Sequence, residues 1–529
     1  MKTIKILTLS LVLLLTAIPM PAIVHADTIL PLETTVTGSN SEQSPEKRYT
    51  LTVPEAGKLT VSAKSYYPMA RLRLLDENNQ MMGYYMDLYN SLPENPSSLT
   101  EELNVEAGVY TLTVGARTED YGKHEVRVDF TPAANNEIEP NQTFAEAMPI
   151  QVNGARIRGF LSYNDRVDTY KVELNEPGRL IMEIESAWGD FDLFDSEGQS
   201  LPKNTIQSDK KAYADLEAGV YYIQKKDYYA HGVYEMSVSF FPANNEEIEP
   251  NNSRASANLI TLNDNKTHIG FLSITDKVDY YKIEMKYNGI LTIDYASEFS
   301  DYTLMQENVH YASYYNDSKT FGKTAKSSQT VELKKGTYYF IPSAQVTRLT
   351  GVYTMSLRAQ PAFKDMSGIY TPAVTYLADK EVTNGLSTTE FGVKDRIKRV
   401  DAAIWLAKIL NLDTSDVHQS SYIDVPKRAW GAVNALKREN IVNGKSATHF
   451  GANDTMTRGE MALLIQRAYE LSGDGVKLPF ADVSSRYAEA VKALMKNNIT
   501  QGKSADKFGT DAAITRGEMA LFLYRADSK

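Results

Sequence analysis

Apolar and polar residues alternate one by one along most of the first 360 residues. The stretches "YEMSVSF" (234–240), "GRLIMEIES" (178–186) and "GILTIDYA" (289–296) all show this two-residue period. Such alternation is typical of a strand with one face in a core and the other in solvent. Glycine and proline separate the alternating stretches, so the pattern predicts many short strands.

Similar segments return at regular intervals in this part of the chain. "NVEAGVYTLTV" (104–114), "DLEAGVYYIQK" (215–225) and "ELKKGTYYFIP" (332–342) are 111 and 117 residues apart, and an alternating strand follows each of them. Repeats of about 110 residues made of short strands are typical of β-sandwiches. We therefore predict three all-β, jelly-roll-like sandwiches, joined by polar connectors, over residues 32–131, 137–241 and 247–360.

The period changes to that of a helix in the last third of the chain. In "MTRGEMALLIQRAY" (456–469) and "ITRGEMALFLYRA" (514–526), apolar residues fall at positions i, i+3, i+4 and i+7. A threonine followed three residues later by a glutamate opens both stretches and predicts a capping box. These segments are therefore expected to be amphipathic helices with defined starts.

A second repeat family accompanies these helices. "NGLSTTEFG" (384–392), "NGKSATHFG" (443–451) and "QGKSADKFG" (501–509) follow one another at intervals of 59 and 58 residues. An aromatic-x-Asp triplet precedes each of them, at 363, 422 and 480. The spacing predicts three all-α modules of helix, loop and helix. We place them at residues 363–412, 422–471 and 480–526.

The first 26 residues are typical of a secretory signal peptide. Lys2 and Lys5 precede a short apolar run, and small residues lead to a cleavage site after Ala26. The alternative is an uncleaved membrane anchor, but Pro19 and Pro21 follow the apolar run, and no later stretch is long and apolar enough to span a membrane. We expect a secreted chain without a membrane span after cleavage.

Charge and cysteine content restrict the partners and the chemistry. The formal net charge is −11 and the chain has no cysteine, which excludes disulfides and a thiolate site and argues against nucleic acid as a partner. From residue 363 onward there are 23 Lys and Arg against 20 Asp and Glu, so this part is mildly basic. An anionic partner is therefore expected to bind the helical modules.

Arginine occupies an electrostatically unfavourable position in all three modules. Arg458 and Arg516 stand at the first helical position, where the helix macrodipole is positive, and Arg399 stands at the matching place in the first module. Two interpretations are open. The guanidinium and the helix-end amides could bind an anion, or the arginine could bond to a carboxylate or carbonyl of a neighbouring module.

The order of motifs in these modules resembles the S-layer homology (SLH) domain. The shared features are the aromatic-x-Asp start, the "NG" or "QG" turn, Phe-Gly, and "TRGE" opening the second helix, in three tandem copies. The resemblance implies a trimer-like helical assembly that attaches a bacterial surface protein non-covalently to pyruvylated secondary cell-wall polysaccharide. Carried over by position, the implied polysaccharide-binding residues are Arg399, Arg458, Arg516, Asp365, Asp424, Asp482 and Trp430, with Lys445 and Lys503 as further anion contacts.

Two features of this part of the chain leave its binding residues open. Trp430 would either stack on a sugar or pack in the core. The first module has Leu386 where the others have lysine, and "KRVD" (398–401) replaces "TRGE". We expect the groove of the first module to be structural.

The three sandwich repeats resemble the pre-peptidase C-terminal domain and its collagen-binding relatives. "EIEPNQ" (137–142) leads to "GFLSYNDRVDTYKVEL" (159–174), and "EIEPNN" (247–252) leads to "GFLSITDKVDYYKIEM" (270–285). Acidic residues on a connector, with an Asp-x-x-Asp pair, can supply the oxygen ligands that Ca²⁺ requires, and these resemble the calcium site of the collagen-binding relatives. The alternative is a solvated acidic linker. The candidate metal ligands are Glu137, Glu139, Asn141, Asp165 and Asp168 in the second sandwich, and Glu247, Glu249, Asn251, Asp276 and Asp279 in the third.

The first sandwich is expected to lack this calcium site. Ser44 and Lys47 stand at its two aspartate positions, and no E-x-E-x-N precedes them.

No enzyme motif is found in the chain. H-E-x-x-H and G-x-S-x-G are both absent, and no stretch of domain length remains outside the two repeat families. We therefore expect a non-enzymatic protein of the cell wall or S-layer surface, whose sandwiches serve structural or adhesive binding to an unknown protein or glycan. The alternative is an accessory or inhibitory factor for a separate secreted peptidase.

Overall fold

The structure is a computed structural model that describes residues 27–528, apart from residues 90, 118, 186–190, 208–209, 230, 317–320 and 345–349. The expected signal peptide, residues 1–26, lies outside the described residues. The chain forms two compact units. The first contains the residues up to Glu173 with Ile181–Ala212 and Gly219–Ser239, and the second contains Leu174–Leu180, Tyr213–Ala218 and the residues from Phe240 onward.

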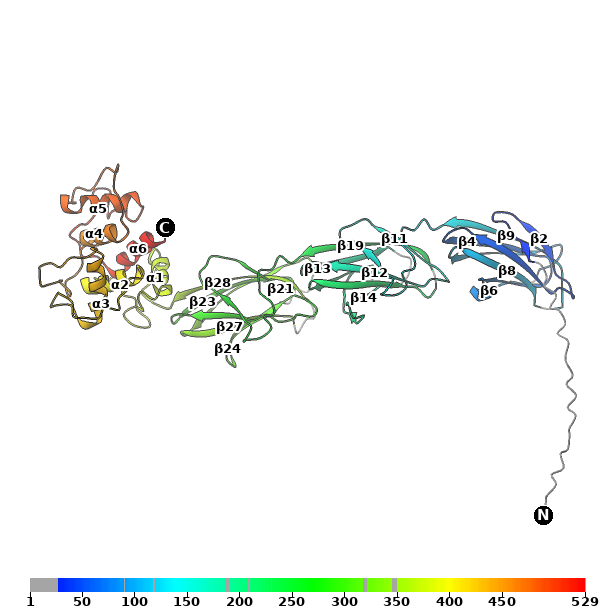
Figure 1. Cartoon of the computed structure of the whole chain (residues 1–529), viewed down its shortest axis with the longest axis horizontal. Coiled ribbons are helices and arrows are strands. Elements are labelled where there is room, and N and C mark those ends of the chain that lie inside the picture. The colour runs from blue at the N-terminus through cyan, green and yellow to red at the C-terminus, as the bar shows by residue number, and fades with distance from the viewer. Residues whose placement is uncertain are drawn as a thin grey trace, which may run out of the picture. The chain divides into compact units, whose positions relative to one another are not determined.

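The first unit begins with a sandwich of two sheets, with strand orders β1-β3-β8-β5-β6 and β2-β9-β4-β7 (Figure 1). Strand β4 alternates buried and half-buried residues, as the two-residue period predicts. Buried residues of both sheets, among them Leu59 and Leu112, form one core. The strands are β1 (Thr28–Ile29), β2 (Val36–Ser39), β3 (Glu46–Val53), β4 (Gly57–Ser65), β5 (Met69–Leu75), β6 (Met81–Tyr89), β7 (Ser97–Val105), β8 (Gly108–Ala116) and β9 (Lys123–Pro132).

A second sandwich follows, with strand orders β10-β12-β18-β14-β15 and β11-β19-β13-β17-β16. Most of it belongs to the first unit, while parts of β12, β13, β17 and β19 belong to the second. Its strands are β10 (Met148–Ile150), β11 (Ile157–Leu161), β12 (Val167–Leu174), β13 (Gly178–Glu185), β14 (Phe191–Phe194), β15 (Ser200–Leu201), β16 (Asn204–Gln207), β17 (Lys211–Leu216), β18 (Gly219–Lys226) and β19 (Gly232–Pro242).

The second unit contains a third sandwich, with strand orders β20-β22-β27-β24-β25 and β21-β28-β23-β26. In all three sandwiches the first short strand pairs in parallel with a strand that has a tyrosine at the equivalent repeat position. These tyrosines are Tyr49, Tyr170 and Tyr281. Its strands are β20 (Asn258–Ile260), β21 (His268–Leu272), β22 (Tyr281–Met285), β23 (Gly289–Ser297), β24 (Asp301–Gln306), β25 (Val309–Tyr314), β26 (Ala325–Leu333), β27 (Gly336–Ser343) and β28 (Gly351–Pro361).

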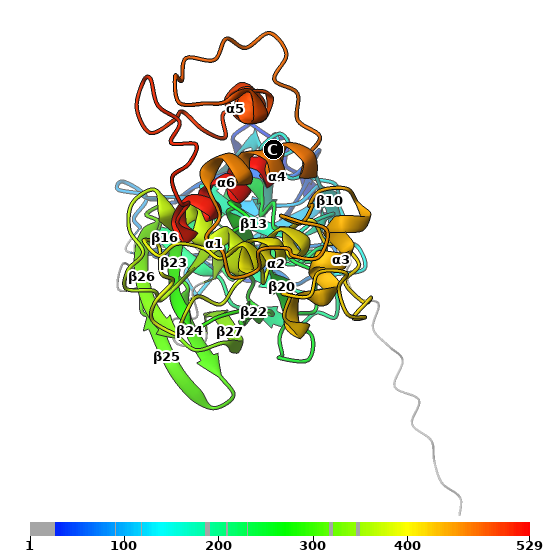
Figure 2. The same cartoon turned by 90° about the vertical axis from the view of Figure 1, so that its left-hand side faces the viewer.

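The last part of the chain is helical and also belongs to the second unit (Figure 2). The predicted capping boxes are present: Thr457 caps α4 with Glu460, and Thr515 caps α6 with Glu518. One hydrophobic core runs through all three modules. The helices are α1 (Tyr370–Asp379), α2 (Arg399–Ile409), the 3-10 helix η1 (Lys427–Ala429), α3 (Trp430–Arg438), α4 (Arg458–Ala468), α5 (Ser485–Lys496) and α6 (Arg516–Asp527).

The helices pair across modules. The first helix of each module packs against the second helix of the preceding one, so that α3 packs on α2 and α5 on α4, and the cycle closes with α1 on α6. Each module thus shares its apolar faces with its neighbours. The prediction of β-sandwiches followed by helices is confirmed, while the finer jelly-roll and trimer-like descriptions stay predictions. No helix within the described residues has the length and apolarity needed to cross a membrane.

Candidate functional sites

The aspartate of each aromatic-x-Asp triplet fastens a loop of its own module. The carboxylate of Asp424 accepts hydrogen bonds from the amides of Phe450, Gly451 and Ala452 at 2.7, 2.8 and 2.8 Å. Asp365 and Asp482 bond in the same way to the amides of 391–393 and 508–510. Burial opposes ionisation, but these hydrogen bonds outweigh it and hold the pKa of all three carboxyls below its usual value.

The arginine of each module reaches the loop of the next module. Nε of Arg399 donates to the carbonyl of Phe450 at 3.0 Å, and Nε of Arg458 donates to that of Phe508 at 3.0 Å. The cycle closes because Nε of Arg516 donates to the carbonyl of Phe391 in the first module at 2.9 Å. Of the two interpretations open from the sequence, the structure realises the bond to a neighbouring module.

These three arginines are buried cations. Their exposed fractions are 7%, 4% and 7% for Arg399, Arg458 and Arg516, and each guanidinium lies over the ring of the phenylalanine whose carbonyl it binds. Burial lowers the pKa of each guanidinium. Arg458 also pairs with Glu518 at 3.0 Å. Their position at a helix start is therefore explained by contacts between modules.

Trp430 packs on the edge of the common core. Its Nε1 donates to the carbonyl of Val425 at 2.9 Å within the same module, and its ring packs against the common core. The side chain remains half-buried, so stacking of the ring on a sugar stays a prediction.

A groove opens where the three modules meet. Its volume is about 440 Å³, and it contains Arg399 from α2, the turn that carries Lys445, residues of α4 and Arg486 from α5. The full lining is Arg399, Asn443, Gly444, Lys445, Glu460, Leu463, Leu464, Arg467 and Arg486. Each module thus contributes a cation to one groove.

The exposed cations of this groove outnumber its acidic groups. Lys445, Arg467 and Arg486 are exposed, whereas Arg399 is buried at the base. Within the described residues, Arg467 and Arg486 have no carboxylate at ion-pair distance, while Lys445 pairs with Asp454 at 2.6 Å. Such a surplus of guanidinium groups fits a carboxylate or phosphate.

Two of the groove cations were missed in the sequence. Arg467 lies in the last turn of α4, and Arg486 lies at the start of α5, where the first module has Ile369. A comparison of the three modules at this position shows arginine in the second and third, Arg428 and Arg486, and isoleucine in the first. The expectation that the groove of the first module is structural stays a prediction. Arg399 of that module lies in a groove with Lys445 of the second module, whereas Leu386 belongs to the loop that Arg516 reaches.

Acidic residues gather at the edge of the second and of the third sandwich. Carboxylate oxygens of Glu137, Glu139 and Asp168 lie within 4.8 Å of one another, as do those of Glu247, Glu249 and Asp279. Asp165 joins the first group through the amide of Gln142, whose Nε2 donates to Glu139 at 3.0 Å and to Asp165 at 2.8 Å. The E-x-E-x-N and Asp-x-x-Asp segments therefore come together in space, as the sequence predicts for a metal site.

Several oxygens in these clusters have no hydrogen-bond donor. Asn141 is fully buried, and within the described residues neither polar atom of its side chain has a partner; the same holds for Oδ1 of Asp168. In the third sandwich, Oδ1 of Asn251 and Oδ1 of Asp279 repeat this arrangement. Buried oxygens without a donor are costly unless a cation completes their coordination.

Tyrosines that the sequence analysis treated as packing residues support both clusters. In the second sandwich, the hydroxyl of Tyr170 donates to Glu137 at 2.8 Å and that of Tyr234 donates to Asp168 at 2.6 Å. Tyr281 and Tyr353 make the matching bonds to Glu247 and Asp279, at 2.7 and 2.6 Å. In the two aspartates these bonds hold one oxygen, and Oδ1 of Asp168 and of Asp279 has no donor within the described residues. The other oxygen of each glutamate accepts backbone and asparagine donors, the amide of Phe160 at 2.6 Å for Glu137 and that of Phe271 at 2.7 Å for Glu247.

The clusters are short of positive charge. Burial and the neighbouring carboxylates raise the pKa of Glu139 to about 8 and that of Glu249 to about 7. The pKa of Asp168 and of Asp279 is raised for the same reasons. A bound divalent cation would remove this repulsion.

The first sandwich has different chemistry at the same place. His124 stands where the others have Tyr234 and Tyr353, and its Nε2 lies 2.7 Å from the hydroxyl of Tyr49. Burial and the nearby Lys47 lower the pKa of His124 to about 4. Lys47 thus brings a positive charge to the position of Asp168, and a neutral imidazole replaces the phenol that supports it.

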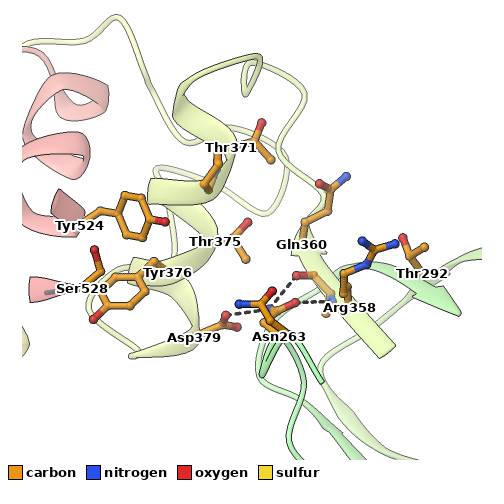
Figure 3. A pocket seen from close by; sticks show the side chains of 13 residues that line it. Asn263, Thr292, Arg358, Gln360, Thr371, Thr375, Tyr376, Asp379, Tyr524 and Ser528 are labelled. Atoms are coloured by element: carbon orange, nitrogen blue, oxygen red, sulfur yellow. Dashed lines mark hydrogen bonds between the residues drawn. The ribbon is translucent and has the colours of Figure 1, made fainter. Parts of the chain in front are cut away.

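A further pocket, of about 670 Å³, lies in the second unit next to α1 (Figure 3). Its polar groups bond to one another: Nδ2 of Asn263 donates to Asp379 at 2.7 Å and to the carbonyl of Ala359 at 2.9 Å. The hydroxyl of Tyr287 also donates to Asp379, at 2.9 Å. Burial raises the pKa of Asp379 in spite of these bonds. These bonds connect residues around β28 with α1, and we assign the pocket no ligand.

Comparison with known proteins identifies the helical part. Residues 362–403, 421–462 and 479–520 match the family model described as the S-layer homology domain. The chain carries three S-layer homology domains. The SLH domains mark the chain as a cell-surface protein.

Known proteins are similar to part of the chain. The Surface-layer 125 kDa protein of Lysinibacillus sphaericus is 31% identical over 202 residues, which are 36% of this chain and 17% of that protein. An endoglucanase of Bacillus sp. (strain KSM-635) is 27% identical over 118 residues, which are 22% of this chain and 12% of that protein. This chain therefore spans less than a fifth of these relatives. The SLH domains and the S-layer relatives indicate a location at the cell wall or S-layer surface.

A solved structure resembles part of the strand-rich region. It is the pre-peptidase C-terminal domain of collagenase from Bacillus anthracis, with 22% identity, 20% of this chain and 95% of that chain covered, and a TM-score of 0.17. Nothing about the ligands of the sandwiches follows from a likeness at this level.

The buried arginines lead to a prediction about stability. Arg458→Ala removes the bonds to the carbonyl of Phe508 and to Glu518, and it takes a charge-assisted donor from the carbonyl of the buried Phe508. We expect a loss of about 2–4 kcal/mol in the free energy of unfolding of the SLH domains. Urea denaturation followed by the circular dichroism of the helices measures it.

Arg486→Ala is the control for this variant, because it removes an exposed arginine and should change stability by less than about 0.5 kcal/mol. Equal denaturation midpoints for the two variants would show that the bonds between modules do not hold the SLH domains together.

Proposed function

We propose that this chain is a surface protein held non-covalently on the cell wall, and that the groove between its SLH domains binds the anionic groups of a secondary cell-wall polysaccharide. The observation that carries the proposal is the surplus of exposed cations in the groove. In the part of the chain that the structure describes, no carboxylate pairs with Arg467 or Arg486. Pyruvate ketals on the polysaccharide carry carboxylates, which fit a pair of guanidinium groups. The predicted contacts of Lys445 and Arg399 belong to the same groove.

The remaining predicted binding residues have a different place in this proposal. Asp365, Asp424 and Asp482 shape the loops, and Arg458 and Arg516 join the modules, so these residues act on the ligand only through the shape of the groove. Lys503 lies in the matching turn of the third module, and its Nζ is 3.7 Å from a carboxylate oxygen of Glu518. The other two junctions between modules have fewer cations. One has Leu386 in place of the turn lysine, and the other has Ile369 at the position of Arg486.

In this role the protein displays its three sandwiches at the cell surface and is not an enzyme. The three sandwiches are the parts that the wall anchor would present for structural or adhesive binding. The sequence contains neither H-E-x-x-H nor G-x-S-x-G. Since relatives of the SLH domains include S-layer proteins and an endoglucanase, the anchor alone does not set the activity of a protein that carries it.

Wall binding tests the groove. We expect the full chain to co-sediment with purified cell wall, and Arg467→Ala with Arg486→Ala to reduce the bound fraction by about tenfold or more, because two charge-assisted contacts are lost. The matched control is Arg428→Ala with Lys492→Ala. It removes the same charge, and Arg428 holds the position of Arg486 in the second module.

Three outcomes are informative. Release by the groove variant alone supports the proposal. Equal release by both variants would place binding outside this groove, and retention of both, or binding to wall stripped of its polysaccharide, would contradict anion recognition.

We also propose that the acidic clusters of the second and third sandwiches bind calcium. Ca²⁺ takes six to eight oxygen ligands, and carboxylates together with an amide oxygen are suitable donors. Glu137, Glu139, Asp168, Asp165 and Asn141 would hold one ion. Glu247, Glu249, Asp279, Asp276 and Asn251 would hold the other. The ion would supply charge compensation and fix the connector to its sandwich.

Calorimetry on the full chain tests the number of sites. We expect about two calcium ions to bind per chain. Calcium should also raise the temperatures of two unfolding transitions, because a ligand that binds only the native state stabilises it. Glu139→Gln should leave one site, whereas Glu146→Gln, in an exposed glutamate of the same connector, should leave two. No binding heat at millimolar calcium would mean that the acidic connectors are only linkers.

A further inference from the structure

The turn before the central strand of a sandwich carries a glutamate that faces the following acidic cluster. Glu106 lies in the turn between β7 and β8, and Glu217 lies in the matching turn between β17 and β18. Both belong to the segment "EAGVY", in copies of the repeat that an acidic cluster follows. Neither residue was a candidate in the sequence, because the repeat marks it only as part of a turn.

The backbone of this turn is bonded to the cluster-bearing sandwich. In the first unit, the amide of Tyr163 donates to the carbonyl of Asn104 at 3.1 Å. In the second unit, the amide of Ile274 donates to the carbonyl of Asp215 at 2.9 Å. The four residues hold equivalent repeat positions, so the same junction is formed twice. In the first unit, the hydroxyl of Tyr110 adds a bond to Asn164 at 3.2 Å.

A serine connects each glutamate to an aspartate of the cluster. The side chain of Glu106 bonds to that of Ser162, whose Oγ accepts the amide of Asp165 at 3.0 Å. Glu217 bonds in the same way to Ser273, whose Oγ accepts the amide of Asp276 at 2.9 Å. Each glutamate therefore lies one side chain away from a predicted metal ligand.

The glutamates also add negative charge to the clusters. Burial and the neighbouring Asp165 and Glu137 raise the pKa of Glu106 in spite of its bond to Ser162. Burial and Glu247 do the same to the pKa of Glu217. A fifth carboxylate beside four others has no structural advantage unless a cation is bound there.

The third repeat has the opposite charge at this position. Its turn has the same local bond, since the hydroxyl of Tyr338 donates to the carbonyl of Lys334 at 2.9 Å as that of Tyr110 does to the carbonyl of Glu106. Lys334 replaces the glutamate, and the SLH domains follow this copy in place of an acidic cluster. The turn itself therefore does not require glutamate.

We propose that Glu106 and Glu217 complete the divalent-cation sites of the sandwiches that follow them, so that each cation is shared by two consecutive sandwiches. The fully buried Asn141 and Asp168, with oxygens that no donor satisfies among the described residues, point to a ligand at the first site. Asn251 and Asp279 do so at the second. This inference rests on the proposed calcium binding. It makes the cation a clamp at the junction as well as a support for the connector.

Calcium titration of the full chain separates the two glutamates from a merely structural role. Glu106→Gln should weaken one of two sites by about tenfold or more and leave the other unchanged, because calcium affinity follows the number of charged ligands. Glu217→Gln should weaken the other site. Lys334→Gln, at the same position of the third repeat, should change neither.

Distances between spin labels provide the readout for the clamp. The chain has no cysteine, so single cysteines in place of the exposed Glu77 and Glu197 label the first and second sandwich specifically. Calcium should narrow the distance distribution in this background and fail to do so after Glu106→Gln. Calcium affinities and distance distributions unaffected by Glu106→Gln and Glu217→Gln would overturn this inference alone, whereas absence of calcium binding by the unaltered chain would overturn both proposals.

Discussion

The bond from a buried guanidinium to the carbonyl of the next module holds the SLH domains together. Arg399, Arg458 and Arg516 each leave their own helix start, cross to a Phe-Gly loop and cover the phenylalanine ring there. Each loop is in turn fixed by an aspartate that accepts three amides. Modules of about 55 residues are small for an independent core, and the closed cycle gives all three a common one.

The groove depends on this cycle. Its base is one of the joining arginines, and its walls come from three modules, so Lys445, Arg467 and Arg486 meet only when the modules are joined. One residue type therefore serves two purposes in this domain. Buried arginines hold the assembly, and exposed ones provide charge for a ligand. The acidic clusters of the sandwiches combine the same two features with opposite charge. The hydroxyl of Tyr234 binds one oxygen of Asp168, and Oδ1 of the same carboxylate has no donor within the described residues.

The periodicity of apolar residues predicted the strands and helices well, but it does not predict contacts between repeats. The two-residue alternation identified the sandwiches, and the capping boxes identified the starts of α4 and α6. The acidic segments of the second sandwich met in space because short connectors bring Glu139 and Asp168 to one edge. The partner of Arg458 was not predictable, since a backbone carbonyl leaves no mark in a sequence. Arg486 and Glu106 were missed because their neighbours in space belong to another repeat. Arg486 lines a groove with residues of the first two modules, and Glu106 bonds to Ser162 of the next sandwich.

The central claim is that a groove built by three SLH domains recognises the negative charge of a wall polysaccharide. Titration calorimetry of the full chain with the purified polysaccharide, before and after chemical reduction of its carboxylates, tests this claim most directly. The account predicts binding to the native polymer that weakens with salt and a loss of binding after reduction. Equal affinity for the native and the reduced polymer would contradict it.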